Sequence, residues 1–307
     1  MTCVSIVMAS YNNEVHIEAT INSILNQCFK DFELIIIDDG SSDNTINIIQ
    51  TFNDVRIHLV QQTNMGLTKA LIKGCTLAKG EFIARHDADD ISFNHRLLKQ
   101  VKVLQDKPNT SLVSTATRFV SPLNEELYVV NHSKSSPQIF SQKTASKKLI
   151  GPPHHGSVMF RTEQYKKVGG YRQQFKVAQD LDLWSRLLEL GDHISLNSVE
   201  YQATLEENSI SALNRNEQLE MERFIIECIE QRKHCGNDKS VIEKLEQHNL
   251  SHSLKSQPIE SLHSDYNYFI ASNLLNKDPK ASLKYFQRSI KTTVSYTHLT
   301  LPTIYSV

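Results

Sequence analysis

Three carboxylates stand together directly after a short apolar run. Asp87, Asp89 and Asp90 follow the run 82–84, which has the composition of a buried strand. Carboxylates this close repel one another, and crowding them without a cation raises their free energy. A hard divalent ion with oxygen ligands removes that penalty and is also a natural partner for a diphosphate. The cluster therefore predicts a Mg²⁺ or Mn²⁺ site at a strand end.

Two other predicted strands end in residues that suit a nucleotide. Tyr11 follows the apolar run 4–9, and Asp38 and Asp39 close the run 32–37. Ligands of open parallel α/β sheets bind beyond the carboxyl ends of the strands, so these residues and the acidic cluster would share one edge. The Asp, Gly, Ser and Asn residues after the second run also favour a turn and a helix cap, which is the alternative for that segment taken alone.

The elements that would position these residues alternate between strand and helix patterns. Apolar residues recur at helical spacing after the early strands, and a nearly all-apolar strand indicates helices on both faces of the sheet. The first half of the chain therefore predicts an α/β fold with a mostly parallel sheet flanked by helices. The expected strands are 4–9, 32–37, 57–60, 82–84 and 112–115, and the expected helices are 17–28, 46–52, 67–78 and 97–104.

The pattern becomes less regular beyond the last of these strands. A polar stretch rich in Ser and Lys over 131–148 predicts a loop. Order returns at 156–161 and in a helix over 181–190, which Gly191 is expected to end.

The last third of the chain is helical and charged. A helix around 219–228 carries apolar residues on one face and glutamates around its polar face, which disfavours an anionic lipid surface. It would pack on the preceding domain or on a membrane-bound partner, and we expect the first. Two further segments predict a helical hairpin, 259–275 and 279–290. The predicted organisation is a first domain over 1–210 and a helical C-terminal region over 211–293.

Composition limits the classes of protein. The 307 residues are 39% hydrophobic, enough for a sizeable core, and a net charge of −1 with a pI near 6.9 gives no global basic field for nucleic acid. We expect neither a signal peptide nor a transmembrane segment, because no apolar run has the required length. Five cysteines lie scattered without the spacing of a zinc site, which fits reduced thiols in a cytosolic protein.

The stretch 294–307 follows the charged helical pattern abruptly. It resembles the translation of a transposase-type sequencing adapter, so we expect it to be non-native. An ordinary β-rich tail is the alternative, and resequencing the parent locus decides between the two.

Several motifs occur together in a fixed order. They include VSIVMASYN at 4–12, IDDGSSDNT at 37–45, ARHDADD at 84–90, GGY at 169–171 and QDLDLWSRL at 179–187. In this order they resemble the family 2 glycosyltransferases, over roughly the first 200 residues. The resemblance implies inverting enzymes of the GT-A fold, a Rossmann-like sheet, to which the helical C-terminal extension would be added.

The resemblance also implies a role for each matching residue on the donor side. Asp39 would hydrogen-bond the nucleotide base, and three residues would surround it: Ala9, Tyr11 and Asp38. Asp87 would contact the ribose or the metal ion, and Asp89 would coordinate Mg²⁺ or Mn²⁺ bridging the diphosphate. The ion would neutralise the charge that develops on the departing nucleoside diphosphate.

An inverting transfer needs a base on the opposite face of the sugar from the leaving group. Asp180 matches the catalytic aspartate of the family, and it starts a helix whose dipole favours the ionised form. Gln179 stands where the family usually has glutamate, so acceptor contacts would differ while the base remains. Asp182 would face another side of the helix, either as an acceptor contact or as a solvated or capping carboxylate.

Other residues keep two interpretations each. Arg85 and Arg96 either reach a phosphate or balance the aspartates. His155, with His154 before it, either lines the acceptor side or belongs to a surface pair without a role. Trp184 either packs in the core, which we favour, or stacks on a sugar.

Our hypothesis is a cytoplasmic, metal-dependent inverting glycosyltransferase that uses a UDP-sugar. The acceptor would be a glycan or lipid-linked glycan in cell-surface glycan synthesis, with any membrane association peripheral, through a partner at the inner face. A catalytically inactive nucleotide-binding interaction protein is the alternative, favoured by Gln179 and by segment 204–209, where relatives often place a histidine. A phosphoryl-transfer enzyme with Asp87 as nucleophile would need phosphatase motifs that the sequence does not contain.

Overall fold

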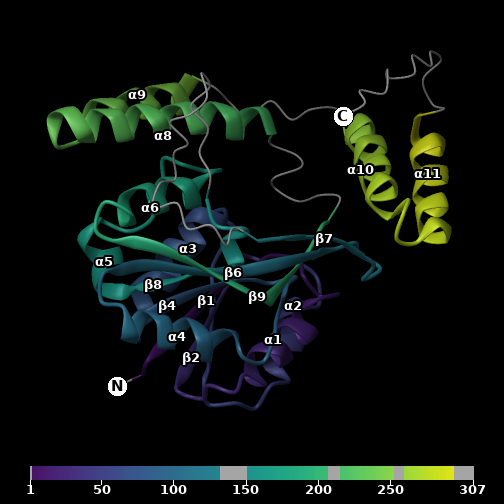
Figure 1. The fold of residues 1–307 in the computed structure, drawn as a ribbon, viewed down its shortest axis with the longest axis horizontal. Helices are drawn as coiled ribbons and strands as arrows, with labels where there is room; N and C mark the ends of the chain where they lie inside the picture. Colours follow the sequence, from purple (N-terminus) through teal and green to yellow (C-terminus); the bar gives the residue numbers. More distant parts are fainter. Residues whose placement is uncertain (1, 132–150, 207–214, 252–258, 294–307) are drawn as a thin grey trace.

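One mixed sheet forms the centre of the protein (Figure 1). The computed structural model describes residues 2–131, 151–206, 215–251 and 259–293. Within them the strand order is β3-β2-β1-β4-β8-β6-β9-β5, with β7 paired to β6. The strands are β1 Val4–Ser10, β2 Phe32–Asp38, β3 Ile57–Gln61, β4 Phe82–Asp87, β5 Ile91–Ser92, β6 Thr110–Val120, β7 Glu126–Val130, β8 Met159–Arg161 and β9 Asp192–Thr204.

Helices cover both faces of this sheet. Side chains alternate along a strand, so Val7 of β1 faces one layer while Ile6 and Met8 face the other. One core joins the sheet to α1, α2 and α4, and the other joins it to α3, α5, α6, α8 and α9. The helices are α1 Ile17–Leu25, α2 Thr45–Gln50, α3 Leu67–Leu77, α4 Arg96–Asp106, α5 Thr162–Lys167, α6 Gln179–Leu187, α8 Arg215–Cys235, α9 Lys239–Ser251, α10 Ile259–Leu274 and α11 Pro279–Thr293.

The parallel half of the sheet brings the predicted strand ends together. Strands β3, β2, β1 and β4 are parallel neighbours. Ser10 of β1 pairs with Asp38 of β2, and Ala9 of β1 pairs with Asp87 of β4. The α/β fold with a mostly parallel sheet, flanked by helices and followed by a helical extension, is confirmed.

Two boundaries differ from the sequence prediction. Strand β4 extends to Asp87, because Arg85 and His86 are buried and continue the pairing with β1. Helix α6 begins at Gln179 and ends at Leu187, before the expected end at Gly191. Gly191 instead allows a close approach of two backbones, since a Cβ there would lie 2.2 Å from the carbonyl oxygen of Asn109.

Three strands were not predicted: β5, β7 and the long strand β9. Strand β9 carries polar residues along much of its length, so its sequence lacks the apolar run that marks the central strands. It forms because it pairs with β6 on one side and β5 on the other. The predicted polar loop, apart from Asn131, and the tail at 294–307 lie outside the described residues.

The C-terminal helices pack within the chain in two places. Helix α8 buries Met221, Ile225, Cys228 and Ile229 in the core that it shares with α6 and the sheet. The hairpin α10–α11 instead packs beside β7, around the buried side chain of Leu127 (Figure 1). Among the helices of the described part, none combines the length and apolar character needed to cross a bilayer.

Replacing Ile225 with alanine is expected to lower the free energy of unfolding by about 3 kcal/mol, because its side chain is fully buried under α8. Leu219 on the same helix is half exposed, and Leu219→Ala should change that free energy by less than about 0.5 kcal/mol. Urea denaturation followed by circular dichroism measures both values. Wild-type stability in the Ile225→Ala protein would contradict docking of α8 on the core.

Candidate active site

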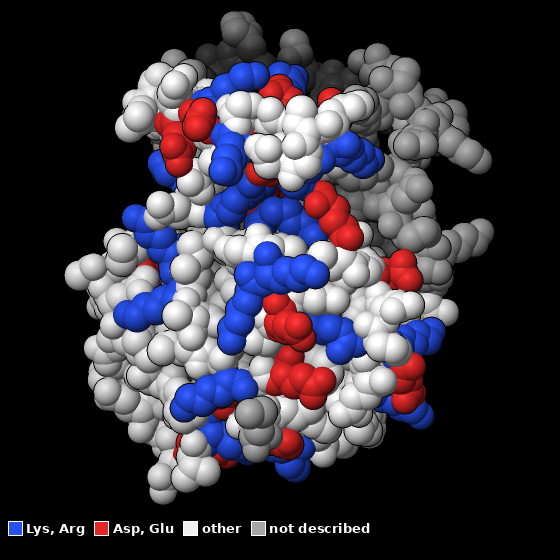
Figure 2. All heavy atoms as spheres, turned by 90° about the vertical axis from the view of Figure 1, so that its left-hand side faces the viewer, with Lys and Arg blue, Asp and Glu red and all other residues white. Residues whose placement is uncertain are grey.

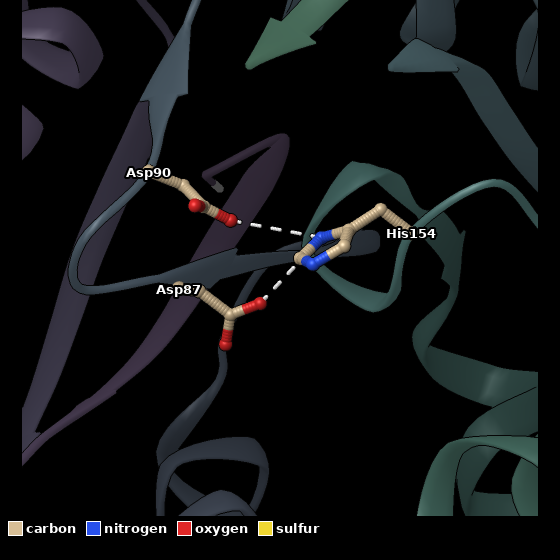
Figure 3. Close-up of side chains that lie close together, drawn as sticks. All are labelled: Asp87, Asp90 and His154. Carbon is tan, nitrogen blue, oxygen red and sulfur yellow. Dashed lines mark ion pairs between the residues drawn. The ribbon is translucent and has the colours of Figure 1, made fainter. Parts of the chain in front are cut away.

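Two carboxylates and one imidazole meet beyond the end of β4 (Figure 3). His154 Nδ1 lies 3.7 Å from Asp87 Oδ2 and 3.6 Å from Asp90 Oδ2, and the three ligand atoms lie within 4.8 Å of one another. Within the described part of the chain, the buried Asp90 Oδ2 accepts no hydrogen bond. Oxygen and imidazole donors around a buried, unpaired carboxylate oxygen fit a divalent cation.

Asp89 is not part of this group, although the resemblance had assigned it to the metal. Residues 88 and 89 form a turn after β4. The turn is fixed from β9, where Thr204 N donates to Asp90 Oδ1 at 2.9 Å and the Thr204 hydroxyl donates to Asp89 O at 3.0 Å. The structure therefore brings Asp90, rather than Asp89, beside Asp87.

The carboxylates of this edge differ in their pKa values. Burial raises the pKa of Asp87, but attraction to Arg85 and, to a smaller extent, to the neighbouring histidines outweighs burial and leaves that pKa at about 2. Burial and repulsion by Asp87 raise the pKa of Asp89 to about 6. Burial, Asp89 and Asp87 together raise the pKa of Asp90 well above its usual value. Burial also lowers the pKa of His154, although the charge of Asp87 opposes this shift.

The two arginines near the cluster have structural roles. Arg85 is buried and forms an ion pair with Asp87, so the structure favours charge balance over contact with a phosphate. Arg96 is also buried and donates to Arg85 O at 2.7 Å and to Ser92 Oγ at 2.9 Å. Its guanidinium thus holds the backbone of β4 in place.

The loops after β1 and β2 are joined by hydrogen bonds. Asn12 adopts a left-handed conformation, with φ of 51°, and its Oδ1 accepts from Ser42 N at 2.8 Å. Ser41 Oγ in turn accepts from Asn12 N at 2.9 Å, and Thr45 Oγ1 accepts from Asn13 N at 2.8 Å. The loops after β1 and β2 are therefore held together by hydrogen bonds at the edge of the sheet.

Asp39 organises the loop that follows β3. Its Oδ1 accepts from Gln62 Nε2 at 2.7 Å and from Met65 N at 2.9 Å, and its Oδ2 accepts from Gly66 N at 2.8 Å. An ionised carboxylate can accept about four hydrogen bonds, so Oδ2 keeps room for one further donor. A nucleotide base could supply that donor.

The neighbours expected around Asp39 lie at the same edge. Asp38 is buried, and its Oδ2 accepts from Gly40 N and Ser41 N, which is the turn chemistry that the segment alone favours. Ala9 is partly buried at the end of β1, and Tyr11 beyond it is 50% exposed.

Asp180 faces the acidic edge from the first turn of α6. Burial raises its pKa to about 6, backbone hydrogen bonds oppose the rise, and the charges of Asp87 and Arg85 act on it in opposite directions. The helix end was expected to keep this carboxyl ionised, but burial outweighs it. A carboxyl with a pKa near neutrality can take a proton in one step and lose it in another.

His155 contacts two aromatic side chains, Tyr171 and Trp184. Its Nε2 lies 2.7 Å from Tyr171 Oη, and its ring is 5.9 Å from that of Trp184. The alternative of a surface pair is wrong, because neither His154 nor His155 is exposed. Trp184 is buried, so it packs in the core and does not stack on a sugar.

The expectation for Asp182 is corrected. Its side chain is 0% exposed, and its oxygens accept from Arg172 and Arg186. It is therefore neither a solvated carboxylate nor placed to contact an acceptor, because burial requires its charge to be paired within the protein. Gln179 beside Asp180 is buried as well.

Two residues lie at the acidic cluster in a way that the sequence did not predict: His154, which was expected only as an alternative on the acceptor side, and Tyr201, which was not expected at all. Tyr201 is fully buried, its ring stacks on that of His154 with centroids 5.5 Å apart, and its Oη accepts from Asp87 N at 3.1 Å. The run of prolines and histidines at 152–155 was a signal for the first. Tyr201 has no such local signal, because strand pairing alone brings it to this edge.

Comparison with known proteins gives a consistent result. The family model described as Glycosyl transferase family 2 matches residues 5–169. EpsE of Bacillus subtilis strain 168, named as a glycosyltransferase, is 34% identical over 194 residues, which is 61% of this chain and 67% of EpsE. The O-antigen biosynthesis glycosyltransferase WbnJ of Escherichia coli is 31% identical over 193 residues, 60% of this chain and 71% of WbnJ.

The fold is also similar to solved structures. Residues 1–349 of TarS from S. aureus, in complex with UDP-GlcNAc, superpose with a TM-score of 0.58 at 17% identity, covering 95% of this chain and 92% of that one.

Proposed function

The chain belongs to the family 2 glycosyltransferases, and we propose that it transfers a sugar with inversion from a UDP-sugar to a hydroxyl group of a surface glycan. The observation that carries this proposal is the meeting of three strand ends opposite Asp180. Ala9 of β1 pairs with Asp87 of β4, and Ser10 of β1 pairs with Asp38 of β2. Asp180 of α6 lies near enough for the charges of Asp87 and Arg85 to act on it. Donor and base would thus lie on opposite sides of one reaction centre.

The donor half of the proposal rests on the loops around Asp39. One acceptor position of its carboxylate is left for a base N–H, and the exposed ring of Tyr11 lies at the same edge. The structural relative TarS binds UDP-GlcNAc, which supports a uridine nucleotide here. The relative WbnJ acts in O-antigen biosynthesis, which supports a polysaccharide or lipid-linked glycan as acceptor.

We assign a Mg²⁺ or Mn²⁺ ion to Asp87, Asp90 and His154. Two carboxylates of one turn and a neutral imidazole supply donor atoms within 4.8 Å of one another. When bound, the ion would offset the negative charge of the diphosphate as it leaves. It would also relieve the repulsion that raises the pKa values of Asp89 and Asp90.

Asp180 acts as the general base in this proposal. It takes the proton of the acceptor hydroxyl while the oxygen forms its bond to the anomeric carbon and the bond to the diphosphate breaks. Its partly buried position keeps bulk water from competing for the proton. An inactive nucleotide-binding protein would need no such base, so the presence of Asp180 at this place favours the enzyme.

We place the reaction on the cytoplasmic side, with any membrane contact made through a partner. Figure 2 shows one face of the protein, on which Lys and Arg alternate with Asp and Glu. Such a mixed surface attracts anionic lipid less than a continuous basic patch does.

Asp180→Asn is expected to lower transfer by at least about 1,000-fold, because the amide cannot accept the proton. Affinity for UDP should stay within twofold, since Asp180 is not among the groups that bind Asp39. A screen of nucleotide sugars, with release of free UDP or another nucleoside diphosphate as readout, identifies the donor. Calorimetry with UDP and Mn²⁺ measures binding. The exposed Asp106→Asn serves as the control, and turnover by Asp180→Asn at its level would refute the assigned base.

The rate should fall as the pH drops through about 6. Burial raises the pKa of Asp180 from 3.8 to about 6, so the base is protonated below that value. Arg85, Asp87 and Tyr171 are the other charged or titratable groups that interact with it. A profile of kcat against pH, from 4.5 to 8.5, locates the acid limb. A limb near the ordinary carboxyl value of 4 would mean that another group is the base.

Removing the metal with EDTA should abolish turnover, and two variants identify the ligand. Asp90→Asn is expected to weaken Mn²⁺ binding at least about tenfold, because it removes the charge of the unpaired oxygen beside His154. Asp89→Asn should weaken it less. Electron paramagnetic resonance of free Mn²⁺, titrated with protein and UDP, measures both. If Asp89→Asn weakened Mn²⁺ binding more than Asp90→Asn, then Asp89, as the sequence predicted, would be the metal ligand.

A further inference from the structure

A network of ion pairs joins α6 to the turn between α8 and α9. Figure 2 shows basic side chains between the upper helical layer and the body of the molecule, with acidic side chains beside them. Three arginines and three acids balance one another. They are Arg172, Arg186, Arg232, Asp182, Glu189 and Asp238.

The inner part of the network is centred on Asp182 of α6. Its Oδ2 accepts from Arg172 Nε at 3.0 Å and from Arg186 Nη2 at 2.6 Å, and its Oδ1 accepts from Arg172 as well. Two guanidiniums around one carboxylate leave a surplus of positive charge in a buried place. A second carboxylate is needed to balance it.

Asp238, in the turn between α8 and α9, supplies that second carboxylate. Its Oδ2 accepts from Arg172 Nη1 at 2.9 Å and from Arg232 Nη1 at 2.6 Å. Arg232 of α8 donates to Ser185 Oγ of α6 at 3.0 Å and to Glu189 Oε1, just beyond the end of that helix, at 2.7 Å. The helical extension is therefore joined to α6 and to the flanking segments by several ion pairs and hydrogen bonds.

Two residues of this ion-pair network, Asp182 and Arg172, lie close in sequence to residues of the candidate active site. Asp180 lies two residues before Asp182 on the same short helix. Tyr171, next to Arg172, holds His155 through the contact between Tyr171 Oη and His155 Nε2. None of the six charged residues belongs to the loops after β1, β2 and β3, which form the nucleotide side.

We propose that Asp238 is a positioning residue for sugar transfer, acting through Arg172 and Asp182 to hold the base Asp180 in place. This inference rests on the proposed function. In this proposal helices α8 and α9 help to position the catalytic base, and their effect is on the acceptor side of the site. A shift of about 1 Å in a base is enough to slow a reaction about 100-fold, so a small movement of α6 would be seen in the rate.

Asp238→Asn tests this assignment, because it keeps the size of the side chain and removes the charge. The probe is the nucleotide sugar that the wild-type enzyme hydrolyses fastest, with water as acceptor. We expect kcat to fall by about tenfold or more, while the KM for the donor and the Kd for UDP stay within twofold. Asp238→Glu should restore most of kcat, which a general loss of packing would not allow.

The matched control lies on the same pair of helices. Lys244 of α9 and Glu227 of α8 form an exposed pair at 3.9 Å, and Lys244→Gln should leave kcat, KM and Kd unchanged. If Asp238→Asn does not fold, Arg172→Lys is tested in its place. Lysine keeps the positive charge, but its single ammonium group cannot bridge both Asp182 and Asp238. Wild-type kcat in either variant, or a parallel loss of UDP affinity and kcat, would overturn the proposal.

Hydrogen exchange separates this proposal from the proposed function. Peptides covering 171–187 should exchange faster in Asp238→Asn than in wild type or Lys244→Gln, whereas peptides covering 32–66 should not change. If wild type hydrolyses no donor at all, the proposed function fails, and faster exchange still establishes the mechanical link. Unchanged exchange over 171–187 rules the link out, whatever the activity.

Discussion

Repulsion among carboxylates at the carboxyl edge of the parallel sheet is the constraint on which the rest of the site depends. Arg85 is a fully buried counter-ion in that edge, and together with the nearby histidines it holds the pKa of Asp87 at about 2 in spite of burial. Asp89, Asp90 and Asp180 all have raised pKa values, because burial and neighbouring charge oppose their ionisation. Placing these carboxyl groups together lowers the stability of the fold, so stability alone does not account for their arrangement. In the proposed site a divalent cation would carry the compensating positive charge, and it could bind the anionic diphosphate of the donor at the same time.

The sequence predicts the parts of the site that local pattern controls. The runs 4–9 and 32–37 are continuous and apolar, so their ends could be located and their polar successors assigned to one sheet edge. Asp90 and His154 could not be assigned in this way. The turn that selects Asp90 is fixed by Thr204 of β9, more than a hundred residues later in the chain. His154 reaches Asp87 only because β8 pairs with β4 directly after it. Asp182 was misjudged since its partner Arg172 lies outside its own helix.

The two sides of the proposed reaction centre are therefore built differently. The donor side consists of loops that directly follow β1, β2 and β3 and bind one another, as when Asn12 bridges to Ser42. The acceptor side combines distant segments: residues 151–158, the turn before α6, and the end of β9. A short motif can specify the first but not the second, whose shape depends on how strands pair. The same division explains why the family can be recognised from motifs while the acceptor cannot.

The helical extension shows how stability and geometry can be supplied by different contacts. Helix α8 docks through Ile225, Cys228 and their apolar neighbours, which are buried in the core that α6 also enters. Burial of that face supplies the free energy of docking, since buried ion pairs contribute little once the loss of hydration is counted. Ion pairs are directional, however, and Arg172 meets Asp182 and Asp238 in one fixed arrangement. The apolar face thus holds the extension on the domain, and the charges fix the orientation in which α6 presents Asp180.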